Sequence, residues 1–131
     1  MASIFSRIIS GEIPCYKIAE DEHFIAFLDV NPVAEGHTLV VPKKEVDYIF
    51  DLDTETYQNL FLFAQKIAKA IHRAVPCRKV GVSVIGLEVP HTHVHLVPIN
   101  QISDINFSKQ KLTPKPEELQ EIQQKIIGYL A

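Results

Sequence analysis

One long amphipathic segment dominates the hydrophobic pattern of the chain. Between Thr54 and Ala74, apolar side chains recur at the spacing of a single helical face, at Leu60, Ala64, Ile67 and Ile71. Acidic residues gather at the start of this segment and basic residues near its end, as the helix dipole favours, and Pro76 follows two residues after its end. The pattern predicts one long helix over about residues 54–74.

Shorter apolar stretches, bounded by turn residues, predict strands. Five of them are expected, over residues 15–20, 23–29, 37–41, 79–85 and 92–98. A short helix is expected over residues 3–9 with Ser3 as its N-cap, and another begins at Pro116. Because the strands come in pairs and do not alternate with helices, we expect an α+β fold. Its sheet is five-stranded and largely antiparallel, with one long helix and short terminal helices.

Composition narrows the class of protein. The chain has 131 residues, of which 47% are hydrophobic and 22% charged, and this fits a single globular domain over residues 1–131. No apolar run approaches the roughly 20 residues that span a bilayer, so no membrane association is expected. The formal net charge is −3 and Lys and Arg form no dense block, so binding to polymeric nucleic acid is not expected.

The N-terminus and the cysteines bear on the compartment. Residues 1–9 contain no long apolar segment, and Gly11 and Pro14 break the next stretch of the chain, so a secretory signal is not expected. Cys15 and Cys77 are isolated and neither belongs to a Cys-x-x-Cys pair, which favours two reduced thiols over a disulfide framework. We therefore expect a cytoplasmic protein.

Histidine is the unusual residue of this composition. Six occur, and three of them stand at alternate positions, at His91, His93 and His95. Alternate side chains of a strand share one face, about 6.6 Å apart at a rise of about 3.3 Å per residue. We therefore expect the three imidazoles to line one face of a strand. His23 and His72 stand alone, and ordinary surface or packing roles explain them.

Three aligned imidazoles fit three kinds of site. As zinc ligands, His91 and His95 would be about 13 Å apart along the strand, too far apart to converge easily on one ion. No metal or other cofactor is therefore expected. A metal-dependent hydrolase stays as an alternative. As buried structural groups, each imidazole would need its own polar partner. As nucleophile and hydrogen-bond donors, imidazoles suit transfer at phosphorus, because a neutral imidazole attacks and its neighbours stabilise an anionic phosphate.

Four blocks of the sequence resemble the histidine triad (HIT) family of nucleotide hydrolases and transferases. Residues 91–98 (HTHVHLVP) resemble the family's pattern of His, any residue, His, hydrophobic, His and two hydrophobics. Residues 4–14 resemble the family's N-terminal signature, and residues 26–32 resemble its ribose-side strand. Residues 36–43 resemble the strand that carries the family's upstream histidine. These blocks come in the family's order and cover about residues 3–100, which leaves residues 101–131 as a C-terminal extension.

The resemblance implies a nucleotide phosphoramidase or hydrolase, or a nucleotidyl transferase. It would act at the α-phosphate of a purine nucleotide derivative, either a nucleoside phosphoramidate or a dinucleoside polyphosphate. His93 would attack phosphorus and form a nucleotidyl-histidine intermediate that water then cleaves. His95 would contact phosphate oxygens or the leaving group, while His91 and His37 would orient the site through hydrogen bonds.

The resemblance also implies a nucleotide pocket and an assembly. It places four apolar residues around the base and an acidic residue at the ribose, namely Phe5, Ile8, Phe27, Val30 and Asp29. The apolar four equally fit an ordinary core, and Asp29 fits a turn before Asn31 and Pro32. Family members commonly pair through the long helix and a strand edge, so a homodimer is expected.

Two departures from the family's pattern bear on function. Where many bacterial members have a Cys-x-x-Cys pair that helps to bind a structural zinc, this chain has Ser3 and Ser6, so no zinc is expected there. Where polar residues before the triad contact phosphates, this chain has Leu87 and Glu88. The second departure keeps an alternative open, which is a nucleotide-binding module with little catalytic activity.

Overall fold

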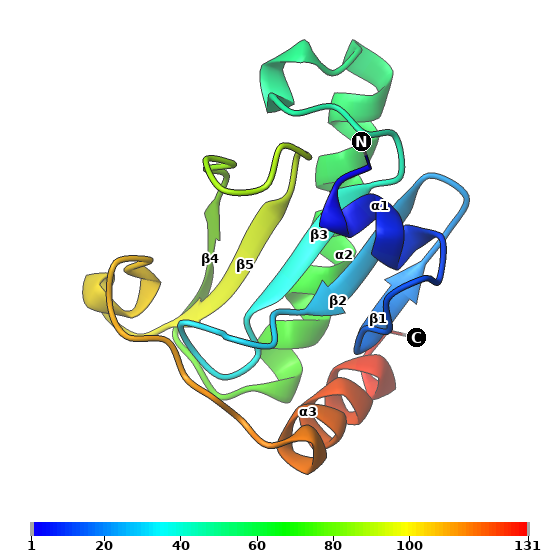
Figure 1. Cartoon of the computed structure of the whole chain (residues 1–131). Helices are drawn as coiled ribbons and strands as arrows, with labels where there is room; N and C mark the ends of the chain where they lie inside the picture. The colour runs from blue at the N-terminus through cyan, green and yellow to red at the C-terminus, as the bar shows by residue number, and fades with distance from the viewer. Residues whose placement is uncertain (1, 131) are drawn as a thin grey trace.

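The structure is a computed structural model that describes residues 2–130. Over that range the chain forms a five-stranded sheet in the order β1-β2-β3-β5-β4, and each neighbouring pair is antiparallel (Figure 1). The strands are β1 (Lys17–Glu20), β2 (Phe24–Leu28), β3 (Thr38–Pro42), β4 (Lys79–Ser83) and β5 (Val94–Ile99). The expected α+β class is confirmed, and so are all five strands, with ends that differ by up to two residues.

The helices agree with the caps and periodicity of the sequence. They are α1 (Ile4–Ile9), α2 (Thr54–Ala74) and α3 (Pro116–Gly128), with 3₁₀ turns η1 (Ile49–Asp51) and η2 (Ile102–Ile105). Ser3 caps α1 by accepting a hydrogen bond from the Ser6 N–H, at 3.0 Å. Asp53 caps α2 in the same way through the Thr56 N–H, at 3.1 Å. The predicted Ser3 cap and the predicted 54–74 helix are therefore confirmed.

The sheet is covered on both faces, which explains why β2 and β3 are apolar without alternation. Helix α2 packs on the far face in Figure 1, where Ala26 and Leu28 join the main core, and α1 lies on the near face. On that near face, Phe5 of α1 packs with a second cluster that includes Ile25 and Phe27. Successive side chains of β2 thus pack alternately into the main core and into the second cluster.

Strand β5 begins later than the sequence predicts. The histidine segment was expected to be extended from Thr92, but regular pairing starts at Val94. The N–H and the hydroxyl of Thr92 both donate to the Val46 carbonyl, at 2.7 and 2.6 Å, and hold this residue against the loop after β3. The expectation that all three imidazoles stand on one regular strand is therefore wrong for His91 and His93.

The C-terminal segment is part of the fold's core. Helix α3 packs against α2 and β1 and buries Leu119, Ile122 and Ile126 in the main core. Within residues 2–130, no helix combines the length and apolar character that crossing a bilayer requires. Cys15 and Cys77 are free thiols in this part of the chain, as expected.

Candidate active site

Four histidines meet on the sheet face opposite α2. His37 and His91 are at most 1% exposed, and His93 and His95 are 7% and 8% exposed. The ring centroids of His93 and His95 lie 4.9 Å apart, and those of His37 and His95 lie 5.2 Å apart. The structure therefore brings together the three residues of the triad segment and the upstream histidine. His23 and His72 are exposed and lie outside this group.

Backbone contact fixes the protonation of the His93 ring. Its Nδ1 lies 2.8 Å from the carbonyl oxygen of His91. Because a carbonyl can only accept, we assign the proton to Nδ1, and the lone pair is then on Nε2. Burial is the main cause that holds the pKa of His93 below its usual value, which keeps the imidazole neutral near pH 7. A neutral ring with an unprotonated Nε2 is the nucleophilic form of histidine.

A directed pair of hydrogen bonds orients the His95 ring. The Val33 N–H donates to Nδ1 of His37 at 3.1 Å, so the His37 proton must lie on Nε2. That Nε2–H donates to Nδ1 of His95 at 2.9 Å, which leaves the His95 proton on its own Nε2. His95 therefore presents an N–H donor on the side of its ring away from His37.

Burial also keeps this pair uncharged. It is the main cause that lowers the pKa of His37 to about 3 and that of His95 to about 4. Mutual repulsion between protonated neighbouring imidazoles and the charge of Lys111 add to the effect. At neutral pH both rings are neutral hydrogen-bonding groups.

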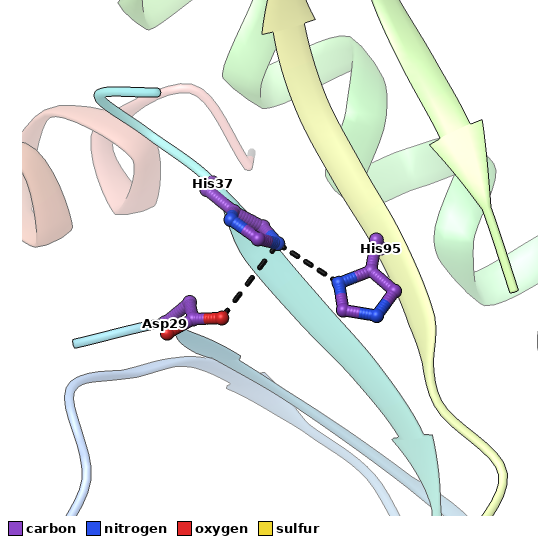
Figure 2. Close-up of side chains that lie close together, drawn as sticks. All are labelled: Asp29, His37 and His95. Carbon is purple, nitrogen blue, oxygen red and sulfur yellow. Dashed lines mark hydrogen bonds and ion pairs between the residues drawn. The ribbon is translucent and has the colours of Figure 1, made fainter. Parts of the chain in front are cut away.

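The Asp29 carboxylate has two separate environments. Its Oδ1 accepts the Asn31 N–H at 2.9 Å, which is the bond of a local turn. Its Oδ2 lies 3.8 Å from Nε2 of His37, and Figure 2 shows His37 between this carboxylate and His95. Burial raises the pKa of Asp29. The turn role that the sequence left open is thus present, and one oxygen still faces the histidines.

Asp29, His37 and His95 also offer a donor set for a metal ion. One ligand atom from each lies within 4.8 Å of the others, and carboxylate oxygen with imidazole nitrogen suits zinc. His37 and His95 are themselves joined by the 2.9 Å hydrogen bond. An ion bound by the two nitrogens of that bond would replace the contact that orients His95.

His91 is held by β3 and by the start of α1. Its Nε2 donates to the Pro42 carbonyl at 2.7 Å, and its Nδ1 accepts from the Ser3 hydroxyl, also at 2.7 Å. Glu45 accepts the Ser3 N–H at 2.7 Å and the Ser6 hydroxyl at 2.6 Å. These bonds, led by the Ser3 N–H, lower the pKa of Glu45 to about 2. The sequence did not predict the Glu45 contact.

The donors around His91 do not fit a zinc ion. Ser3 and Ser6 present hydroxyls, which are poor zinc ligands, and each of these hydroxyls is engaged in a hydrogen bond within the group. The four side chains satisfy one another without an ion. Their effect is to fasten α1 to the first histidine of the triad.

The expected base-binding residues fall into two groups. Phe5 and Phe27 are buried with ring centroids 5.7 Å apart, and Phe5 lies 4.8 Å from the His93 ring. Ile8 is half-buried against the same cluster, whereas Val30 is 50% exposed. Phe5 and Phe27 fit the ordinary-core interpretation and also border the triad. Ile8 and Val30 retain exposed surface that a base could contact.

One feature of the surroundings was not predicted. The Phe107 ring lies 4.6 Å from the His95 ring and 5.8 Å from the His37 ring. It comes from a segment whose sequence has no periodicity, so no pattern pointed to it. Before the triad, Leu87 is 89% exposed, and the charge of Glu88 acts to raise the pKa of His93.

Comparison with known proteins gives consistent matches. Residues 10–102 match the sequence profile described as HIT domain. Protein hit of Bacillus subtilis is 36% identical over 138 residues, covering 98% of this chain and 94% of its own. Adenosine 5'-monophosphoramidase hnt1 of Schizosaccharomyces pombe is 30% identical over 128 residues and covers 96% of each chain. A crystal structure of a Hit-like protein involved in cell-cycle regulation from Bartonella henselae gives a TM-score of 0.85 at 34% identity, covering 97% of this chain and 95% of that one.

Proposed function

Because the chain belongs to the histidine triad (HIT) family, we propose that it is a nucleotide hydrolase or nucleotidyl transferase. It acts at the α-phosphate of a purine nucleoside phosphoramidate or dinucleoside polyphosphate. The observation that carries this proposal is the His93 ring, whose Nδ1–H bond to the His91 carbonyl leaves Nε2 free to attack. The Schizosaccharomyces pombe relative named an adenosine 5'-monophosphoramidase supports the substrate class.

The reaction proceeds in two displacements. His93 Nε2 forms a bond to the α-phosphorus, and the bond from phosphorus to the leaving group breaks. The leaving group takes the electron pair of that bond and, where it is an amine, a proton from solvent. The His95 Nε2–H donates a hydrogen bond to a phosphate oxygen as negative charge builds there. Water then attacks the phosphorus of the nucleotidyl-histidine, which releases the nucleoside monophosphate and restores His93. His91 and His37 act as positioning residues.

The nucleoside lies between α1 and the end of β2. The base contacts the Ile8 and Val30 surfaces beside Phe5 and Phe27, which support the pocket from the second core. The ribose hydroxyls donate to Oδ2 of Asp29, because Oδ1 is engaged with the Asn31 N–H. This arrangement directs the α-phosphate toward His93 and His95.

Intact-mass analysis tests the proposal. The protein is mixed with adenosine phosphoramidate, stopped rapidly in denaturant and compared with His93→Ala and with His23→Ala, which changes an exposed histidine outside the site. Wild type and His23→Ala are expected to release AMP and to gain an adenylyl group transiently, and His93→Ala to do neither. Equal turnover in His93→Ala, or no turnover in wild type, contradicts the enzyme proposal.

A nucleotide-binding module with little catalysis is the second candidate. It is favoured by the segment before the triad, where Leu87 is exposed to solvent and Glu88 places negative charge near His93. This candidate predicts that purine nucleotide binds while no adenylylated protein forms. Calorimetry without any nucleotide binding contradicts both candidates.

We further propose that the protein is a homodimer. β4 lies at the edge of the sheet and exposes Val82, which is 55% accessible. An aromatic group near the start of α2 is also exposed, with Tyr48 at 56% and Phe50 at 68%. A second copy would cover both features by extending the sheet and pairing the α2 helices. Light scattering is expected to give twice the chain mass, and a monomeric mass contradicts this proposal.

A further inference from the structure

The segment between β5 and α3 forms one wall of the triad site. It runs past the loop between β2 and β3 on its way to α3 (Figure 1), and the Leu112 N–H donates to the Pro32 carbonyl at 2.9 Å. Upstream of that bond, the Phe107 ring packs on His95 with centroids 4.6 Å apart. The segment is therefore attached on one side to the loop that carries His37 and on the other to the triad itself.

This wall carries a positive charge. The Lys111 ammonium donates to the backbone carbonyl of Phe107 at 3.4 Å, and the ring of the same residue covers His95. The Lys111 charge acts to lower the pKa of His37 and His95 and opposes the effect of burial on the pKa of Asp29. Among residues 2–130, no carboxylate forms a salt bridge with Lys111, whereas Lys43 is paired with Glu20 at 2.8 Å.

A cation beside the histidines would add a charge that the histidines themselves lack. Burial keeps the imidazoles of His37, His93 and His95 neutral at pH 7, so they carry no net positive charge. The N–H groups of His37 and His93 are already engaged, which leaves that of His95 for a phosphate. Glu88 adds a negative charge near His93. Interaction with a cation strengthens when the pair is partly shielded from water, and Lys111 is half-buried.

We propose that Lys111 and Phe107 form an anion subsite beside His95, where the ammonium binds a phosphate oxygen of the nucleotide. This inference rests on the proposed function, because it assumes a nucleotide at the triad. The ammonium turns from the Phe107 carbonyl to the phosphate, and the Phe107 ring stays on His95 and keeps water from that side of the imidazole. The C-terminal segment thereby contributes to phosphate recognition, which offsets the charge of Glu88.

Calorimetric titration of the full chain with AMP and with adenosine tests the subsite. Lys111→Gln removes the charge, Lys111→Arg keeps it, and Lys109→Gln is the matched control from the same segment, where Lys109 donates to the Asp104 carbonyl at 3.3 Å. We expect Lys111→Gln to weaken AMP binding about tenfold or more, as loss of a charged hydrogen bond does, and to leave adenosine binding unchanged. Lys111→Arg should retain most of the affinity, and Lys109→Gln should match wild type.

Hydrolysis of adenosine phosphoramidate by the same preparations separates the two proposals. If wild type hydrolyses it but AMP binds equally to wild type and Lys111→Gln, the subsite is wrong and the proposed function stands. An equal loss of AMP and adenosine affinity in Lys111→Gln also overturns the subsite, since it signals general damage to the site. If wild type neither hydrolyses the phosphoramidate nor binds AMP, both proposals are wrong.

Discussion

The Nε2 atom of His37 lies 2.9 Å from Nδ1 of His95, and the Val33 N–H on the opposite side of the His37 ring determines which of them donates. A backbone group before β3 thus decides the protonation of a side chain on β5. His93 is fixed in the same manner, by the His91 carbonyl. The site is oriented by main-chain groups, which do not titrate.

Loss of the His37 donor should impair catalysis more than binding. His37→Leu removes the hydrogen bond to His95 Nδ1 and frees the His95 ring to adopt the other tautomer. We expect kcat to fall at least about tenfold, because the His95 N–H no longer points reliably at the phosphate oxygen, with a smaller change in KM. His37→Gln offers an amide N–H in a similar place and should retain more activity than His37→Leu. Equal kcat values for the two variants, both folded by circular dichroism, would show that the donor has no such role.

Stability should fall as the solution becomes acidic. The folded-state pKa values of about 3 for His37 and about 4 for His95 lie below the usual value of 6.5, so the unfolded chain binds more protons at intermediate pH. Stability is therefore complete above about pH 6.5 and is lost as the pH falls toward those values. The slope from two such groups approaches about 2.7 kcal/mol per pH unit. Urea unfolding from pH 8 to pH 5 measures it, and His37→Leu should give a shallower slope. A free energy of unfolding that does not change over this range contradicts the prediction.

Ser3 should matter more to stability than its place near the N-terminus suggests. Ser3→Ala removes the hydroxyl donor to buried His91 Nδ1 and the N-cap of α1 together. We expect a loss of about 2–3 kcal/mol in the free energy of unfolding, measured by urea titration. Ser10→Ala is the matched control at the other end of α1, where the hydroxyl donates to the Arg7 carbonyl in an exposed setting. Its change should stay within about 0.5 kcal/mol, and equal losses in the two variants would refute the proposed contact.

Gly36 should not tolerate a side chain. Its φ is +91°, and an added Cβ would lie 2.9 Å from Val75 Cγ2 and 3.2 Å from Pro98 Cγ. Gly36→Ala should therefore lower the melting temperature by several degrees, because roughly 2 kcal/mol or more is lost, and it should shift neighbouring His37. Gly128→Ala, in open space at the end of α3, should leave the melting temperature equal or slightly raised. Similar melting temperatures for the two variants would contradict the steric argument.

The helices and strands could be predicted because their signals lie within short stretches of the sequence. The apolar face of α2 repeats with the helical period, and Asp53 and Ser3 cap their helices by bonds that span three residues. The strands were found from short apolar stretches between turn residues, and β2 and β3 are buried along their whole length. Such signals lie within a few consecutive residues, so a single sequence contains them.

Contacts between distant segments could not be predicted in the same way. The alternation of histidines suggested one regular strand, but Thr92 bonds to Val46 and regular pairing begins only after His93. Glu45 and Phe107 reach the triad from segments without periodicity. His37, Asp29 and Phe5 were identified from afar, and that came from their places in a family pattern and not from spacing.

The bond between Ser3 and His91 joins residues that are 88 positions apart, which has a consequence for the order of assembly. Ribosomes deliver α1 early, and its partner His91 emerges only after β1, β2, β3, α2 and β4 have been made. The neighbouring pairs β1–β2 and β2–β3 can close early, because short loops connect them. A nascent chain can therefore bring Phe5 and Phe27 together before His93 has been made, and the triad assembles only after β4 has emerged.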